Sequence, residues 1–131
     1  MKLVLDTSAY SHLRTGHEGV LDHLVRAETV FLPTVVLGEL EAAFRLETRA
    51  KENRQTLRDF LDEPFAFVLP VSEDVARKYG EIFCELRKAG TPLPINDVWI
   101  AATAIVSGAR LITFDSDFER IAKLDCIRLS I

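Results

Sequence analysis

The sequence has few of the residues that build thiol, zinc or phosphate-loop sites. Its two cysteines, Cys84 and Cys126, stand far apart and form no CxxC pair, so neither a zinc site nor a disulfide framework is predicted. We expect both thiols to be buried. The six glycines are scattered, which excludes a glycine-rich loop that could cradle a phosphate.

Other common catalytic arrangements are absent as well. The three histidines lack the i, i+4 spacing of a helical metal-binding pair, and we expect them at the surface: His12, His17 and His23. Ser8 and Ser11 lack the glycine-flanked elbow of a hydrolase nucleophile. The residue two places after Asp6 is a serine rather than an acid, which argues against a DxD phosphotransfer nucleophile.

Length and hydropathy set further bounds. With 131 residues and 48% hydrophobic content, the chain is expected to form a single domain over residues 1–131. No apolar run is long enough to cross a bilayer, and the stretch before Asp6 is too short for a signal peptide, so a cytoplasmic protein is predicted. The formal net charge of -4 does not support nucleic-acid binding through bulk charge. A polyanionic substrate would need a local basic surface or a bound metal.

Strand-like and helix-like patterns alternate along the chain. This alternation predicts an α/β fold, a three-layer α/β/α sandwich with a central, mainly parallel sheet. The expected strands are Lys2–Leu5, Val30–Leu32, Ala66–Leu69, Arg110–Thr113 and Ile127–Ile131. Ser72 is expected to cap a helix that ends before Gly90.

A second helix is expected after the proline-containing loop that follows Gly90. Asn96 can cap it, with Asp97 as its first residue, and its body from Val98 to Val106 is apolar almost all round and therefore buried. Asp97 is either part of the cap or a functional acid that enters the core at a helix N-terminus. Because Asn96 can already supply the cap, we favour the functional role.

Two predicted strands finish on an aspartate, Asp6 near the start of the chain and Asp115 near its end. Sites in an open parallel sheet gather outside the carboxyl ends of strands, so both carboxylates are expected in one crevice. Their mutual repulsion would be costly without a cation.

The third predicted acid lies in a segment that contains both Glu39 and Glu41. Helical spacing places them on opposite edges of an apolar stripe. Val35 and Leu46 project on the Glu39 side, whereas polar neighbours flank Glu41. We therefore interpret Glu39 as the inward candidate ligand and Glu41 as the more solvated residue.

Carboxylates without matching histidines or thiolates form an oxygen-only donor set. Such a set suits hard cations, Mg²⁺ first and Mn²⁺ as a substitute, and argues against zinc. A cation held by a few carboxylates keeps positions for water and phosphate oxygens. Hydrolysis of a phosphodiester by metal-activated water is the reaction that this pattern predicts.

Four segments carry these acids in order: Leu5-Asp6-Thr7-Ser8, Gly38-Glu39-Leu40, Gly90-Thr91-Pro92 followed by Asn96-Asp97-Val98-Trp99-Ile100-Ala101-Ala102, and Thr113-Phe114-Asp115-Ser116-Asp117-Phe118-Glu119-Arg120-Ile121. In order and spacing they resemble the motifs of PIN-domain ribonucleases, especially the VapC toxins of toxin–antitoxin pairs. The resemblance implies a PIN-like fold, Mg²⁺- or Mn²⁺-dependent endoribonuclease activity, a homodimer, and inhibition by a small VapB-like antitoxin.

The resemblance also implies roles for individual residues. Asp6, Glu39 and Asp97 match the three principal acids of the family. Asp115 is assigned to the metal site as a fourth acid, and Asp117, one residue closer than in the longer form of the motif, to a supporting metal-site role. Thr7 and Thr113 are expected to orient Asp6 from the second shell. Ser8 stands where the family often has Asn, and its hydroxyl can still bond a neighbouring carboxylate or water in that shell.

Alternatives remain at this stage for the RNA-binding surface and for the function. The basic segment from Arg45 to Arg58 either contacts phosphates or is a solvated helix face with i, i+4 ion pairs, and Arg87 with Lys88 is a second candidate. The chain could instead process one cellular RNA without a toxin role. A catalytically silent RNA-binding or antitoxin-titrating module is the third alternative, against which the intact acids weigh.

Overall fold

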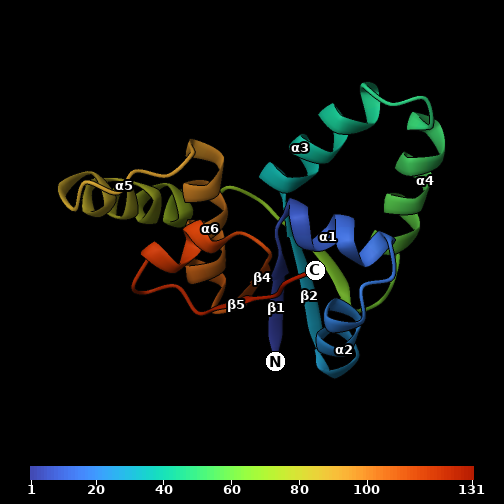
Figure 1. The fold of residues 1–131 in the computed structure, drawn as a ribbon, viewed down its shortest axis with the longest axis horizontal. Helices are drawn as coiled ribbons and strands as arrows, with labels where there is room; N and C mark the ends of the chain where they lie inside the picture. Colours follow the sequence, from blue (N-terminus) through green and yellow to red (C-terminus); the bar gives the residue numbers. More distant parts are fainter.

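In a computed structural model that describes residues 1–131, five strands form one parallel sheet (Figure 1). They are β1 (Lys2–Leu5), β2 (Thr29–Pro33), β3 (Ala66–Leu69), β4 (Arg110–Thr113) and β5 (Cys126–Arg128). Their order across the sheet is β3-β2-β1-β4-β5, and every neighbouring pair is parallel. The predicted α/β fold is therefore confirmed.

Helices cover both faces of this sheet. On one side lie α1 (Thr7–Arg14), α2 (Glu18–Arg26), α3 (Thr34–Arg45) and α4 (Ala50–Leu61); on the other lie α5 (Glu73–Lys88) and α6 (Ile95–Ser107) (Figure 1). A short 3₁₀ helix, η1 (Ser116–Arg120), follows β4. No helix is both long enough and apolar enough to cross a membrane.

The strand order reverses at β1, and this reversal positions the site. The chain moves from β1 outward to β2 and β3, then returns to the other side of β1 to form β4. Leu3, Val4 and Leu5 are completely buried between the layers, which anchors β1 at the centre. Ligand sites of open α/β sheets lie at such a switch point, beyond the carboxyl ends of the two strands. Here that point holds Asp6 and the segment after Thr113.

Most predicted boundaries agree with the structure to within one or two residues. Ser72 caps α5 by accepting a hydrogen bond from the Val75 amide at 3.2 Å. The last strand is shorter than predicted, because after Arg128 the chain makes one more bond, from the Leu129 amide to the Thr113 carbonyl at 2.9 Å, and then leaves the sheet.

The predicted burial of Cys84 was wrong, and Cys126 and the histidines differ in part from their predicted environments. Cys84 is exposed, because α5 packs against α6 rather than on the sheet, and Cys126 is only half-buried. All three histidines are half-buried instead of lying free at the surface. His12 stacks on Phe114 with ring centroids 3.9 Å apart. The ring of His17 caps α2 through its Nδ1 and bonds the Ser130 carbonyl through its Nε2.

The predicted cap of α6 was also wrong. The helix begins at Ile95, directly after Pro94, and no side chain caps it. Proline lacks an amide hydrogen and its φ is fixed near the helical value, so a helix can start immediately behind it. Asn96 is consequently the second helical residue and Asp97 the third, still within the first turn.

Candidate active site

Asp6 is the most deeply placed acid of the site. It follows β1 and caps α1, with its Oδ1 accepting the Ala9 amide at 2.8 Å and the Ser8 hydroxyl at 2.8 Å. Its Oδ2 accepts the Thr113 hydroxyl. Only 5% of the residue is exposed, so these donors replace the water that burial removes. The Oδ2 atom keeps one lone pair for a further partner.

The two hydroxyls that hold Asp6 also fasten the end of β4. Thr113 accepts the Asp115 amide at 3.0 Å, and Ser8 accepts the Phe114 amide at 3.2 Å. Each hydroxyl thus donates to Asp6 and accepts from the backbone beyond β4. These bonds fix the separation between Asp6 and the Asp115 segment.

Glu39 faces the site from the first half of α3. Its carboxylate accepts the Thr7 hydroxyl at 2.6 Å and the Asn96 side-chain amide at 3.4 Å, so it connects α1 and α6. The expectation that Thr7 orients Asp6 was therefore wrong, because its hydroxyl donates to Glu39 instead. The Asn96 contact was missed by the sequence analysis because Asn96 was expected to cap its own helix.

Glu41 belongs to a different environment. It forms salt bridges with Arg54 at 2.7 Å and with Arg45 at 3.1 Å, and Arg54 holds its pKa below the ordinary value. Leu46 was expected to mark the buried side of α3, but it is 89% exposed, so it does not distinguish Glu39 from Glu41. What separates the two glutamates is their partners: arginines for Glu41, and neutral donors for Glu39.

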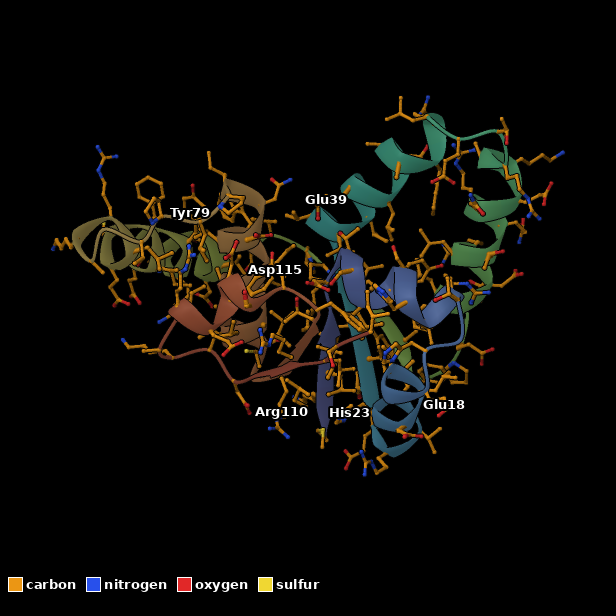
Figure 2. The ribbon with its side chains drawn as sticks, viewed as in Figure 1. Glu18, His23, Glu39, Tyr79, Arg110 and Asp115 are labelled. Carbon is orange, nitrogen blue, oxygen red and sulfur yellow. The ribbon has the colours of Figure 1, made fainter.

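Asp115 lies across from Glu39 (Figure 2), and two further acids accompany it. Oxygen atoms of Asp97, Asp115 and Asp117 lie within 4.8 Å of one another, which brings the first turn of α6 against the start of η1. Asp115 caps η1 by accepting the Asp117 amide at 2.8 Å. Asp117 also pairs with Arg120 at 3.3 Å, a contact that its i, i+3 spacing could have indicated.

The crowding of negative charge appears in the titration of Asp97. Burial, followed by the charges of four neighbouring carboxylates, raises its pKa from 3.8 to about 6. Those neighbours are Asp115, Glu39, Asp6 and Asp117. Burial also raises the pKa of Asp6, against the opposing effect of its hydrogen bonds. All five predicted acids therefore meet at one place, although four separate segments carry them.

This donor set fits a hard divalent cation. It supplies only carboxylate oxygens, three of which already lie close enough to share one ion. No histidine or cysteine joins the group. A cation there would relieve the repulsion that raises the pKa of Asp97.

The basic segment of α3 and α4 turns out to be largely paired with acids. Arg45 and Arg54 bind Glu41, Arg49 binds Glu52, and Arg58 binds Asp62. Lys51 is left without an ion pair. These pairs favour the interpretation of a solvated, self-neutralised helix surface over a continuous phosphate-binding surface.

Residues 3–124 match the family model of the PIN domain, and the chain belongs to that family. Among curated proteins it is 33% identical to ribonuclease VapC5 of Mycobacterium tuberculosis, over 96% of this chain and 94% of that protein. Within the PIN-domain family it is therefore one of the VapC ribonucleases.

Solved structures agree with this assignment. A member of the VapBC family of toxin–antitoxin systems, VapBC-5 from Mycobacterium tuberculosis, superposes with a TM-score of 0.75 at 28% identity, over 98% of each chain. VapBC2 from Rickettsia felis, bound to a DNA fragment from its promoter, gives a TM-score of 0.88 at 24% identity over 99% of this chain and 100% of that chain. The second match supports the fold alone.

Proposed function

We propose that this chain is a Mg²⁺-dependent endoribonuclease, with Mn²⁺ able to substitute, and the toxin of a type II toxin–antitoxin pair. The observation that carries the proposal is the meeting of five carboxylates at the switch point of the sheet, where Arg120 is the one basic side chain paired with any of them. A cation bound there would neutralise part of this negative charge and could also bind an oxygen of an RNA phosphate.

The proposed roles follow from the contacts. Asp6, Glu39, Asp97 and Asp115 would hold the cation, and Asp117, partly neutralised by Arg120, would support them. A bound cation lowers the pKa of a water and neutralises charge on the phosphate. The protein contributes orientation: Thr113 and Ser8 fix Asp6, and Thr7 fixes Glu39 before substrate arrives.

Sequencing of RNA 5′ ends tests this function directly. A pulse of wild-type expression should create new ends at defined sites, and an Asp6→Asn control should not. With purified protein, Mg²⁺ or Mn²⁺ should support cleavage and excess EDTA should abolish it. Ca²⁺, with its longer and looser coordination, should support little turnover. Undiminished cleavage in EDTA would refute the metal mechanism.

We further propose that a small antitoxin silences the enzyme by placing an arginine or lysine among the acids. A guanidinium pairs with carboxylates in a bidentate manner and competes with the cation for the same oxygens. Changing that one basic residue of the antitoxin to Ala should weaken inhibition, and the inhibited complex should bind Mn²⁺ more weakly than the free enzyme. Equal Mn²⁺ affinity in the two states would show that the antitoxin only blocks RNA access.

The other partner that we propose is a second copy of this chain. Apolar side chains around the α5–α6 side of the site are exposed, among them Phe83 at 36% and Ile95 at 59%. Sedimentation at the mass of a single 14.7 kDa chain would remove this proposal.

A further inference from the structure

One buried donor of the protein has no partner. Tyr10, on α1, is 2% exposed, yet its hydroxyl makes no hydrogen bond. Its ring packs edge-on against Phe60, with centroids 5.8 Å apart. Burial raises the pKa of the hydroxyl, so it keeps its proton and remains a donor. An unsatisfied buried donor is costly, which makes it a candidate for contact with a ligand.

Tyr10 borders a cavity of about 250 Å³ between α1, α3 and α4. Phe44 of α3 forms part of its wall. The rest of the lining is mostly polar and consists of Arg14 from α1, Arg49 directly before α4, and Glu52, Asn53 and Thr56 from α4. A polar cavity of this kind suits a charged or strongly hydrogen-bonding group rather than an apolar side chain.

The uncompensated charge of this cavity is positive. Its one acid, Glu52, accepts two hydrogen bonds from Arg49, at 2.9 and 2.5 Å, so those two charges offset one another. Asn53 is directed to Glu47. Arg14 is exposed and takes part in no salt bridge, and its charge acts on the Tyr10 hydroxyl. A positive site on a chain of net charge -4 favours an anionic ligand.

The cavity also lies on the same side of α1 as the acids, farther along the helix. Asp6, Tyr10 and Arg14 are spaced four apart, so they form one row along α1. At 1.5 Å per residue, the row spans about 12 Å from Asp6 to Arg14. Helix α3 also reaches both places, because it carries Glu39 at the acids and Phe44 at the cavity.

We propose that this cavity binds a backbone phosphate of the RNA strand, one that flanks the bond being cut, through the Tyr10 hydroxyl and the Arg14 guanidinium. The proposal rests on the ribonuclease function proposed above. A phosphate accounts for the charge, the unpartnered donor and the alignment with the acids together. It also gives the RNA a positive contact close to a site whose own residues repel it.

Tyr10→Phe is the sharpest variant, because it removes only the hydroxyl. If the hydroxyl binds phosphate, KM for a random-sequence single-stranded RNA library should rise about tenfold while kcat stays the same, since a hydrogen bond to a charged acceptor is among the stronger kinds. The melting temperature should stay equal or rise, because an unsatisfied buried group is removed. A purely structural role of the hydroxyl would lower the melting temperature on its removal and leave KM unchanged.

Arg14→Gln should raise KM by a similar factor and flatten its salt dependence. Arg26→Gln is the matched control: Arg26 also lies in the last turn of a short helix, is exposed and makes no salt bridge, but it does not line the cavity. Replacing flanking phosphates one at a time by neutral methylphosphonates should identify a single linkage whose replacement weakens binding to the wild type and has no effect on Arg14→Gln.

RNA binding is measured separately by fluorescence anisotropy in an Asp97→Asn background. RNA binding that depends on Tyr10 and Arg14 in this background, together with no cleavage by the wild-type protein in Mg²⁺ or Mn²⁺, would refute the proposed function and leave the phosphate contact standing. Cleavage with wild-type KM in both variants would overturn the inference and leave the function intact. Weaker antitoxin binding with unchanged RNA binding would assign the cavity to the antitoxin and would likewise overturn it.

Discussion

Asp6→Asn should lower RNA cleavage by about a thousandfold, the scale on which a single charge-stabilising catalytic group acts. The variant keeps the shape of the side chain, and Oδ1 can still accept from Ala9 and Ser8. It loses the charge that a cation needs. The metal-free protein should be at least as stable as the wild type, because one of several mutually repelling carboxylates is gone. Initial cleavage rates and thermal melting in EDTA are the two measurements.

The two glutamates of α3 provide the matched comparison for this result. Glu39→Gln should reduce activity on the same scale as Asp6→Asn, since Glu39 faces Asp97 and pairs with no basic residue. Glu41→Gln should behave nearly as wild type, because the Glu41 carboxylate forms salt bridges with Arg54 and Arg45 instead of facing the other acids. If Glu41→Gln were the damaging change and Glu39→Gln harmless, our assignment of the third acid would be wrong.

The affinity for Mn²⁺ should fall steeply once the pH drops below about 6, the pKa of Asp97 in the metal-free fold. Below that pH a proton must leave Asp97 before a cation can bind, so the apparent Kd should rise by roughly tenfold per pH unit. Isothermal titration at several pH values measures the slope. An affinity that stays constant between pH 7 and 5 would remove Asp97 from the set of ligands.

The same residue gives the metal-free protein an unusual dependence of stability on pH. Between the ordinary pKa of 3.8 and about 6, the folded state binds more protons at Asp97 than the unfolded chain does. The contribution of Asp97 to the free energy of unfolding is therefore most favourable below pH 3.8, decreases as the pH rises through this window, and is constant above about 6. Asp97→Asn should remove this decrease, so the variant should be more stable than wild type at pH 7 and lose the advantage in acid.

Local patterns predicted most of the fold because the features they describe are local. A central strand that is covered on both faces, such as the one containing Leu3 to Leu5, must be apolar throughout. A serine cap such as Ser72 needs only the backbone amide three residues later in the chain. Two of the candidate acids, Asp6 and Asp115, could be selected for a related reason: residues that follow parallel strands converge at the edge of the sheet where those strands end.

The predictions that failed depended on contacts between distant segments. Nothing near Cys84 in the sequence indicates that α5 packs on α6 and leaves that cysteine outside. The half-buried ring of His12 depends on Phe114, which is about a hundred positions away. Asn96 was misassigned because its actual partner, Glu39, lies on another helix. Side-chain partners across helices follow from the packing of layers, which periodicity along one segment does not encode.

The position of β4 in the sheet has a consequence for the newly made protein. Asp115 reaches Asp6 only after β4 has paired with β1, and these strands are separated by nearly the whole chain. Contacts of such long sequence separation form late and require most of the polypeptide to be present. A nascent chain that has not yet reached β4 already has Asp6, Glu39 and Asp97 and still lacks Asp115 and Asp117. A chain terminated before β4 therefore cannot assemble the acid cluster, because two of its five carboxylates are missing.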